Sequence, residues 1–295
     1  MRLKADLTLL VVSIIWGSAF VAQRVAGQQG SVYLFNGARY VLAALVVLPF
    51  VRRVNLTSMP HDQYKWMFIA GFFLFAGSAL QQAGMVYTTA GNAGFITALY
   101  VVLVPFALFF FWREKPHWMS VVAVVLAGVG AFLLSTGGRF EVQKGDALEV
   151  VGALFWTFHV IIIGKFAAKF EAMSFSVGQL LVCGVLNLGV GLVSESMMTF
   201  NWQLAFAIGY TAFFSLGLCY TLQVWAQQHT PPADAALILS LESVFAVLSG
   251  WLLLDERLAV IQIFGAVLIF IAVVLSQFKE WTSGKIDHDH LVEGR

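Results

Sequence analysis

Three side chains that can carry charge lie deep inside long apolar runs, and they are the first candidates for chemistry. They are an acid, Glu242, a cation, Arg39, and an imidazole, His159. If those runs cross a bilayer, a charge at its centre costs about 2.5 kcal/mol or more, so each group needs a partner or a function. Glu242 could bind an ammonium group or carry a proton, or it could be a hydrogen-bonded acid that ties two helices together. The sequence leaves both interpretations open.

Arg39 and His159 each have a functional and a structural interpretation. The forked guanidinium of Arg39 could hold a carboxylate or phosphate through two hydrogen bonds. It could equally pair with Glu242 or cap helix ends. His159 follows Trp156 by three residues and shares its helix face. We expect His159 to be a hydrogen-bonded core residue, with substrate or proton binding as the alternative.

Two glutamines and several aromatic residues occur near these groups. Gln81 and Gln223 are 142 residues apart in corresponding helices, and amides can line a cavity because they both donate and accept. They can also link helices, but their repetition favours the cavity. Aromatic walls would suit a flat, partly apolar ligand. The candidate substrate-binding residues are therefore Trp16, Arg39, Gln81, Tyr100, Trp156, His159, Gln223 and Glu242.

Motifs for other chemistries are missing from the sequence. There is no phosphate loop for ATP, no H-E-x-x-H and no G-x-S-x-G. Cys183 and Cys219 lie in apolar runs and are expected to be core residues, and His288 and His290 lie in a polar tail that we expect to be a solvated, frayed end. We expect no catalytic residue, metal or cofactor. A transported solute would then move down its own gradient or with a coupled proton, for which Glu242 and His159 are the visible carriers.

The composition indicates a membrane protein. Of the 295 residues, 60% are hydrophobic and 11% are charged, whereas soluble domains usually have about 25% charged residues. So few charges cannot cover a particle in water, and the mean hydropathy of +0.84 agrees. The net charge of +1 provides no basic surface for nucleic acid. We expect a lipid bilayer and a small molecule as the partners.

Ten apolar runs have the length of a membrane-spanning helix. About 20 apolar residues cross the hydrocarbon core as a helix, because an isolated strand would leave its backbone unpaired there. The sequence therefore predicts an all-α integral membrane protein with ten transmembrane helices. The first run resembles a signal peptide, but it is long enough to span and is kept as a helix. The runs are 5–25, 31–51, 64–86, 90–111, 117–136, 146–165, 174–194, 202–226, 232–254 and 258–278.

The basic residues predict the orientation, since cytoplasmic loops are rich in lysine and arginine. With a cytoplasmic N-terminus, twelve of the seventeen fall on the inner side, four fall on the outer side, and Arg39 lies within a span. Both termini are therefore expected in the cytoplasm, in a multi-pass protein of the inner membrane. The outer four are Arg24, Arg139, Lys144 and Arg257, and the inner twelve are Arg2, Lys4, Arg52, Arg53, Lys65, Arg113, Lys115, Lys165, Lys169, Lys279, Lys285 and Arg295.

The second half of the chain repeats the first at a nearly constant offset. Trp16 matches Trp156 and Phe35 matches Phe175, each at 140 residues, while Arg113-Glu114-Lys115 matches Asp255-Glu256-Arg257 at 142. Five is an odd number, so the second half enters the membrane from the opposite side. Inverted repeats around a central cavity are a device of transporters, although a duplicated scaffold is the alternative. We expect repeats at 1–138 and 139–278, followed by a polar cytoplasmic tail at 279–295.

Three stretches carry a resemblance to a known family. They are IIWGSAFVAQRV, FNGARYVLAAL and LILSLESVFAVLSGWLLLDERLAVIQIFGAVLIFIAV. The chain resembles the ten-helix EamA-type branch of the drug/metabolite transporter superfamily, which also includes aromatic amino acid exporters of the YddG type. The resemblance implies export of amino acids, similar metabolites or drugs. It also favours a structural role for Arg39, because relatives with varied substrates have an arginine there. Many relatives have a proline where this chain has Ser243, while Pro105 lies in the mirror helix, so we expect unequal kinks in the two halves.

The function that follows is a secondary transporter, and an exporter of amino acids, aromatic ones included, that works by alternating access. The alternatives are an intramembrane enzyme, which would need clustered acids or histidines, and a non-transporting scaffold or lipid scramblase. Ala123, Ala127 and Ala131 form a stripe of small residues that allows close helix packing. It is compatible with a monomer or a weak homodimer.

Overall fold

The computed structural model describes the backbone of residues 1–28, 31–51, 60–136, 144–198, 201–254, 257 and 259–292, with side chains up to Ser276 except Ser135. Several expectations lie outside this part of the chain. They concern Arg52, Arg53, Arg139, Asp255, Glu256, the boundary between the halves near residue 138, and the side chains of the tail.

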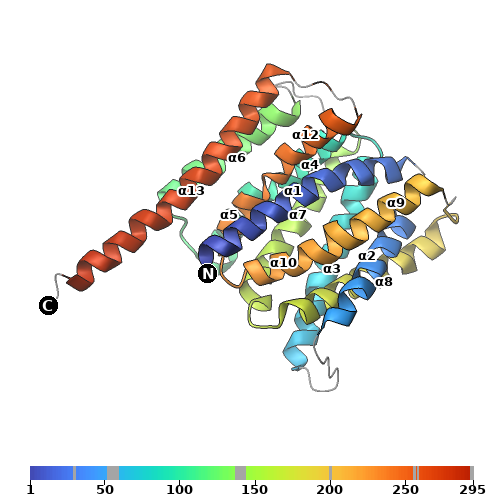
Figure 1. Ribbon diagram of the computed structural model, residues 1–295, viewed down its shortest axis with the longest axis horizontal. Helices are drawn as coiled ribbons and strands as arrows, with labels where there is room; N and C mark the ends of the chain where they lie inside the picture. Colours follow the sequence, from blue (N-terminus) through green and yellow to red (C-terminus); the bar gives the residue numbers. More distant parts are fainter. Residues whose placement is uncertain are drawn as a thin grey trace.

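The described backbone is a bundle of helices, without a strand (Figure 1). Several spans are divided into shorter segments, and two contain π-helical stretches, η3 and η4. The helical segments are α1 (Arg2–Gly27), α2 (Tyr33–Val47), η1 (Leu48–Phe50), α3 (His61–Met85), α4 (Ala90–Ala98), α5 (Tyr100–Trp112), α6 (Trp118–Thr136), α7 (Asp146–Ile162), η3 (Ile163–Ala167), α8 (Ala172–Ser194), α9 (Trp202–Tyr210), η4 (Thr211–Leu218), α10 (Cys219–Ala226), α11 (Pro232–Leu239), α12 (Glu242–Leu254) and α13 (Val260–Val292).

The predicted membrane fold is confirmed. Eight helical stretches are long and apolar enough to cross a membrane, and the shorter apolar helices Trp118–Leu134 and Val260–Ser276 complete the predicted set of ten. The tail differs from the expected frayed end, since α13 continues as a helix to Val292 with no proline to interrupt it.

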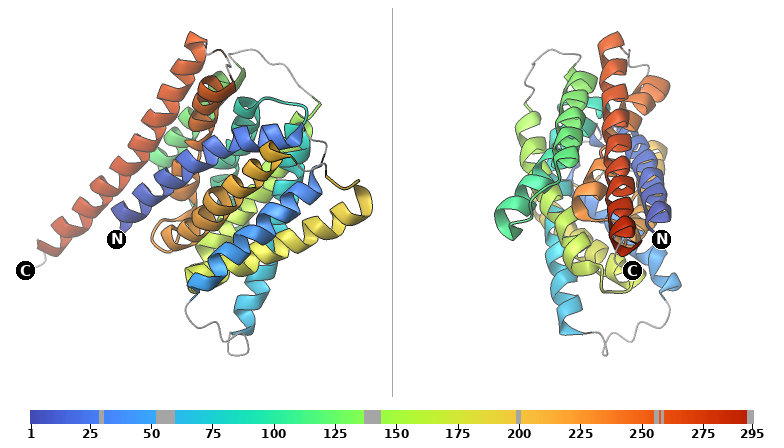
Figure 2. Two further views of the ribbon diagram at one scale, coloured as in Figure 1. Left: turned by 45° about the vertical axis from the view of Figure 1, so that its right-hand side comes forward. Right: turned by 90° about the vertical axis from the view of Figure 1, so that its left-hand side faces the viewer.

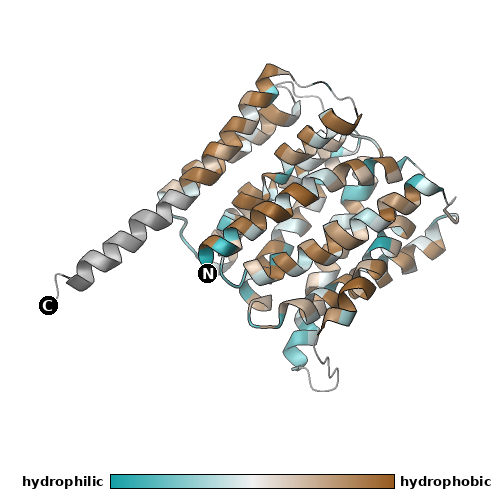
Figure 3. Cartoon of the chain, viewed as in Figure 1, coloured by the Kyte–Doolittle hydropathy of each residue, from teal (hydrophilic) through white to brown (hydrophobic). Residues whose placement is uncertain are grey.

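Polarity is distributed as it would be in a lipid solvent. Large apolar side chains cover the outside, with Val193 91% exposed and Phe110 71% exposed, whereas Gln223 and His159 inside the bundle are 0% exposed. Figure 3 shows the apolar residues spread along the outer surfaces of the helices. Lipid chains are as apolar as leucine, so burying leucine gains little and polar contacts inside the bundle set the packing.

Equivalent helices of the two halves pack against each other in opposite directions. Along α2 and α8, Gly37 lies against Leu188, and Gly184, earlier on α8, lies against Val41, later on α2. Glycine is needed at both points, because an added Cβ would come within 2.6 to 2.7 Å of the facing side chain. Antiparallel packing of matched helices is what an inverted duplication predicts.

The last helix of each half follows the same rule. α6 and α13 lie side by side (Figures 1 and 2) and contact each other through Gly130 and Gly265. The Gln262 amide at the start of α13 donates to the Leu134 carbonyl near the end of α6, so these helices are also antiparallel. One face of the bundle therefore carries the N-terminus and the start of α3, and we name it the N-terminal face. The other carries the starts of α2, α7 and α13 and is named the opposite face.

One span in each half is broken at the same relative place. The break between α4 and α5 is at Leu99, and the break between α11 and α12 is at Ser240 and Leu241. Their offset of 141 residues agrees with the sequence repeat. Neither break falls at Pro105, so the expected inequality is not seen in their placement. In the second half the hydroxyls of Ser240 and Ser243 bond to carbonyls three residues earlier, which allows a helix to bend without proline.

A carboxylate at the end of α8 holds the start of α2. Glu195 accepts hydrogen bonds from the backbone N–H groups of Val32 at 2.8 Å and Leu34 at 2.9 Å, from that of Tyr33, and from the Ser31 hydroxyl. Burial alone would raise the pKa of Glu195, but these four donors hold the pKa below its ordinary value. This contact satisfies backbone donors that a helix start leaves unpaired.

We expect Glu195→Gln to lower the free energy of unfolding by about 1 kcal/mol at neutral pH, the usual cost of losing a helix cap. Because the folded pKa is depressed, the wild-type stabilisation is present above the ordinary pKa of 4.5 and is lost as the pH falls through the folded value. Thermal unfolding in detergent across this pH range measures both effects. An equal acid dependence in the wild type and the variant would contradict the assignment.

Candidate functional site

A cavity in the middle of the bundle is lined by all eight residues that the sequence singled out. Trp16 comes from α1, Arg39 from α2, Gln81 from α3, Tyr100 from the start of α5, Trp156 and His159 from α7, Gln223 from α10 and Glu242 from the start of α12. The remaining lining residues are Phe20, Gln23, Tyr40, Thr97, Val160, Ser215, Leu216 and Tyr220. Both halves contribute, and two of the eight residues directly follow the helix breaks.

The cavity is narrow in this conformation. The volume open to the centres of water-sized molecules is about 40 Å³, which is enough for a few waters. A metabolite would enter only if the surrounding helices moved apart. A site that widens when its two halves rock against each other is the arrangement expected for alternating access.

Arg39 is held by its own helix. Its Nε donates to Asn36 Oδ1 at 3.0 Å, and its guanidinium carbon lies 4.9 Å from the centre of the Phe35 ring and 5.3 Å from that of Tyr40. Asn36 is fixed in turn by donating to the Ser78 carbonyl of α3. Among the described residues Arg39 forms no ion pair, so the predicted alternative of a pair with Glu242 is wrong. Two aromatic faces and an amide stabilise the cation instead.

Glu242 is the first residue of α12, at the break in its span. The Tyr100 hydroxyl, at the matching break in the first half, lies next to its carboxyl group. Neither the hydroxyl nor Glu242 Oε1 has a hydrogen bond of good geometry within the described part of the chain. The N-terminus of a half-helix favours negative charge, so this position can hold a carboxylate or attract a cationic group to it.

His159 lies between two aromatic rings. Trp156 and Tyr220 each meet it edge-on, with ring centres 5.9 and 5.7 Å away. Its Nε2 lies 2.9 Å from Oε1 of Gln179 on α8. This bond fits the expected core histidine, yet Nδ1 has no partner among the described residues. One nitrogen is therefore structural and the other remains available at the cavity wall.

Unpaired polar atoms gather around this cavity. Within the described chain, hydrogen bonds are missing for the Tyr100 hydroxyl, Trp156 Nε1, His159 Nδ1, both amide atoms of Gln223, and Glu242 Oε1. Buried polar groups in native proteins are nearly always paired, and each exception needs an explanation. In lipid the need is greater, because water cannot replace the missing partner. A polar solute or waters in the cavity would supply these partners.

Other cavity residues are already paired. Gln81 Nε2 donates to the Thr97 hydroxyl at 2.8 Å, and Trp16 Nε1 donates to the Ser215 carbonyl in η4 at 2.7 Å. π-helical stretches expose or redirect carbonyl groups and are frequent at functional sites. These two bonds fix the walls rather than offer binding groups.

Sequence reasoning missed two aromatic lining residues. Tyr40 directly follows Arg39, and Tyr220 precedes Gln223 by three residues, which places it on the same face of α10. Helical spacing from the chosen residues could have found Tyr220. Tyr87, considered among the aromatic residues near the polar groups, is 56% exposed and does not line the cavity.

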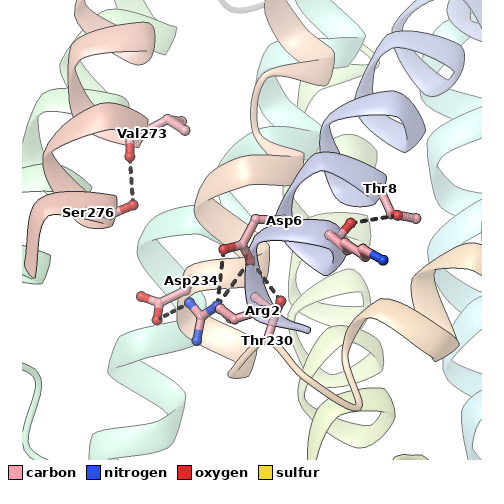
Figure 4. Close-up of polar contacts among 8 residues, drawn as sticks. Arg2, Asp6, Thr8, Thr230, Asp234, Val273 and Ser276 are labelled. Atoms are coloured by element: carbon pink, nitrogen blue, oxygen red, sulfur yellow. Dashed lines mark hydrogen bonds and ion pairs between the residues drawn. The ribbon is translucent and has the colours of Figure 1, made fainter. Parts of the chain in front are cut away.

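An ion network connects the two halves at the N-terminal face (Figure 4). Arg2 on α1 contacts Asp6 at 3.1 Å and Asp234 on α11 at 3.0 Å. The Thr230 hydroxyl, just before α11, donates to Asp6 at 2.8 Å. The acids are almost buried, so this contact is stronger than an ordinary surface pair. It holds α1 against α11 on the N-terminal side of the cavity.

The comparisons with known proteins agree with this architecture. Residues 3–136 and 143–278 each match the EamA-like transporter family. The chain belongs to that family. Its members are transporters, so the expectation that it is not an enzyme is confirmed, and two matched stretches agree with the repeat seen in the sequence. Groups of three or more potential metal ligands are absent from the described residues.

Relatives of this EamA-like chain span nearly its whole length. An uncharacterized transporter of Archaeoglobus fulgidus is 35% identical over 274 residues, which is 93% of this chain and 86% of the relative. The inner membrane transporter YedA of Escherichia coli K12 is 25% identical over 90% of this chain and 88% of its own. A probable amino-acid metabolite efflux pump of the same strain is 24% identical, over 94% and 96%. A crystal structure superposes with a TM-score of 0.76 at 16% identity, over 94% and 98%, and shows a shared fold.

The ion network generates a prediction about local opening. We expect Arg2→Gln to destabilise the contact by about 1.5 to 3 kcal/mol, the range for hydrogen bonds to charged groups. Amide hydrogen exchange in the first turn of α11 should then be faster than in the wild type by one to two powers of ten. Lys4→Gln, at an exposed position on the same helix, is the matched control. Equal exchange in Arg2→Gln and Lys4→Gln would refute the role of the network.

Proposed function

We propose that this EamA-like transporter exports amino acids, with aromatic ones favoured, across the cell membrane by alternating access. The observation that carries the proposal is the set of unpaired polar atoms around one aromatic-walled cavity that also contains an arginine and a carboxylic acid. The relative named as an amino-acid metabolite efflux pump supports the same solute class.

A zwitterion matches the charges of the cavity. The Arg39 guanidinium offers a planar fork for the solute carboxylate. Glu242 and the Tyr100 hydroxyl can receive the ammonium group. Both charged side chains already have neighbours that hold them in place, so little side-chain entropy is lost on binding.

The remaining walls suit an apolar or aromatic side chain. Trp16 and Trp156 come from equivalent positions of the two halves, and the Trp16 ring lies 5.2 Å from Tyr220, centre to centre. Trp156 Nε1 and the Gln223 amide can hydrogen-bond to the polar edge of a solute. Stacking on such rings contributes about 0.5 to 1.5 kcal/mol per pair beyond the area buried.

The orientation follows from the basic residues. In the described chain the N-terminal face carries Arg2, Lys4, Lys65, Arg113, Lys115, Lys165 and Lys169, and the opposite face carries Arg24, Lys144 and Arg257. The excess favours a cytoplasmic N-terminal face. The Arg2 network would then close the cytoplasmic side of the cavity, and opening it would admit solute for export.

We expect the reconstituted protein to transport L-phenylalanine saturably into or out of liposomes. Arg39→Lys should weaken apparent affinity about tenfold or more, since loss of a bidentate charged contact costs about 1.5 to 3 kcal/mol. Trp156→Ala should weaken aromatic solutes more than alanine. Uptake of radiolabelled solute over a concentration series measures both.

Matched controls keep this test specific. Tyr87→Ala removes an exposed aromatic side chain outside the cavity and should leave affinity unchanged. Glu171→Gln should likewise be neutral, because this acid only caps α8. If Arg39→Lys and Trp156→Ala transport with wild-type kinetics, the cavity is not the solute site. If no member of an amino-acid panel is transported by the wild type, the proposed solute class is wrong.

A further inference from the structure

A second carboxyl group is sealed inside the bundle, in the first turn of α7. Glu149 is 1% exposed, and neither of its carboxylate oxygens has a hydrogen bond of good geometry to a described residue. Gly84 of α3 packs so closely that an added Cβ would lie 2.6 Å from Glu149 Cγ, and Gly145 packs on the Gly84 carbonyl. Glycine backbone of α3 and α7 therefore walls this carboxyl group on one side.

Glu149 lies one side chain away from the central cavity. The Thr97 hydroxyl interacts with its carboxyl group and also lines the cavity. That hydroxyl already accepts a hydrogen bond from Gln81 Nε2 at 2.8 Å, so its own proton can point to Glu149. A hydroxyl that accepts on one side and donates on the other can pass a proton between an acid and cavity water.

The charges near Glu149 do not compensate a negative carboxylate. Asp146, three residues earlier on α7, adds a second negative charge and accepts a hydrogen bond from Asn92. The nearest segments, residues 77–85 of α3 and α4, carry no titratable side chain. Arg24 of α1 is engaged by the Met85 carbonyl.

The other elements packed on α7 carry their ionisable groups elsewhere. α5 contributes Tyr100 at the cavity, while Asp234 of α11 and Lys165 of η3 lie at the N-terminal face. An ionised carboxylate without a partner in such a dry site costs several kcal/mol. Glu149 therefore holds its proton in this conformation.

We propose that Glu149 is the proton-coupling site of the transporter, loaded from the opposite face and discharged through Thr97 into the central cavity. This proposal rests on the proposed function as a solute transporter. The sealed contact of Gly84 with Gly145 separates the carboxyl group from the opposite face, and rocking of α3 against α7 would open it to water. With the N-terminal face in the cytoplasm, protons moving inward would drive solute outward. The sequence pointed to Glu242 and His159 as carriers and missed this residue.

The test uses liposomes that contain a trapped pH-sensitive dye and an imposed L-phenylalanine gradient. In the wild type the gradient should drive protons in the opposite direction. In Glu149→Gln this proton flux should fall to the level of protein-free liposomes, while exchange of labelled for unlabelled phenylalanine continues and shows that the variant is folded. Glu171→Gln, an exposed acid at the N-terminal face, should behave as the wild type.

Two results separate the coupling site from the proposed function. If Glu149→Gln moves as many protons per solute as the wild type, or if the wild type transports phenylalanine without moving protons, the coupling role is wrong and the transport function stands. If the wild type transports no phenylalanine, infrared spectroscopy of the purified protein still tests the proton. The carbonyl band of a protonated carboxyl group should persist in Glu242→Gln at neutral pH and disappear in Glu242→Gln/Glu149→Gln. A band that survives in the double variant would overturn the assignment.

Discussion

Inside a bilayer a polar group has no water to fall back on, and this constraint accounts for most of the structure. Helices satisfy their own backbone, so the described chain is helical throughout its apolar runs. Where a helix must begin near the boundary, Glu195 supplies acceptors for four donors of the neighbouring helix start. Where spans break in mid-bundle, the serine hydroxyls of the second half bond to nearby carbonyls. Against this background the unpaired atoms around the central cavity stand out as a set, because the rest of the molecule shows how readily such groups find partners.

The inverted duplication decides where those exceptions occur. Matched helices pack antiparallel as α2 with α8 and α6 with α13, and the two helix breaks face the cavity from opposite halves. The half-helix starts at Tyr100 and Glu242 bring a hydroxyl and an acid together at the centre. The N-terminal face is held by ion pairs between side chains, whereas the notch near Glu149 is closed by glycine backbone. The two sides of the cavity are therefore sealed by interactions of different kinds, which is suitable for a molecule that opens them in turn.

Much of this could be predicted from the sequence, and the failures have physical causes. Apolar runs of span length gave the helices, and a constant offset gave the repeat. The rarity of ionisable groups within the runs selected residues that share one cavity, because function is the usual reason for tolerating such a cost. The pairing of Arg39 with Glu242 was wrong because nearest-charge reasoning ignores the ring faces of Phe35 and Tyr40, which stabilise the guanidinium locally. Glu149 was missed because it lies near the end of an apolar run, where an acid is normally solvated. Its burial depends on Gly84 of another helix, which one-dimensional patterns do not reveal.

Fusion of the two halves into one chain allowed the centre to become chemically lopsided. At the repeat offset Arg39 corresponds to Gln179, His159 to Ala19, and Glu242 to Val101. A homodimer of half-length chains would place every charge twice, once on each side of its twofold axis, and would repel itself at the midpoint. Here Gln179 supports the imidazole of His159 instead of duplicating the guanidinium. Covalent linkage thus permits one cation and one acid to face a solute with a head and a tail, so the recognised molecule need not share the symmetry of the protein that carries it.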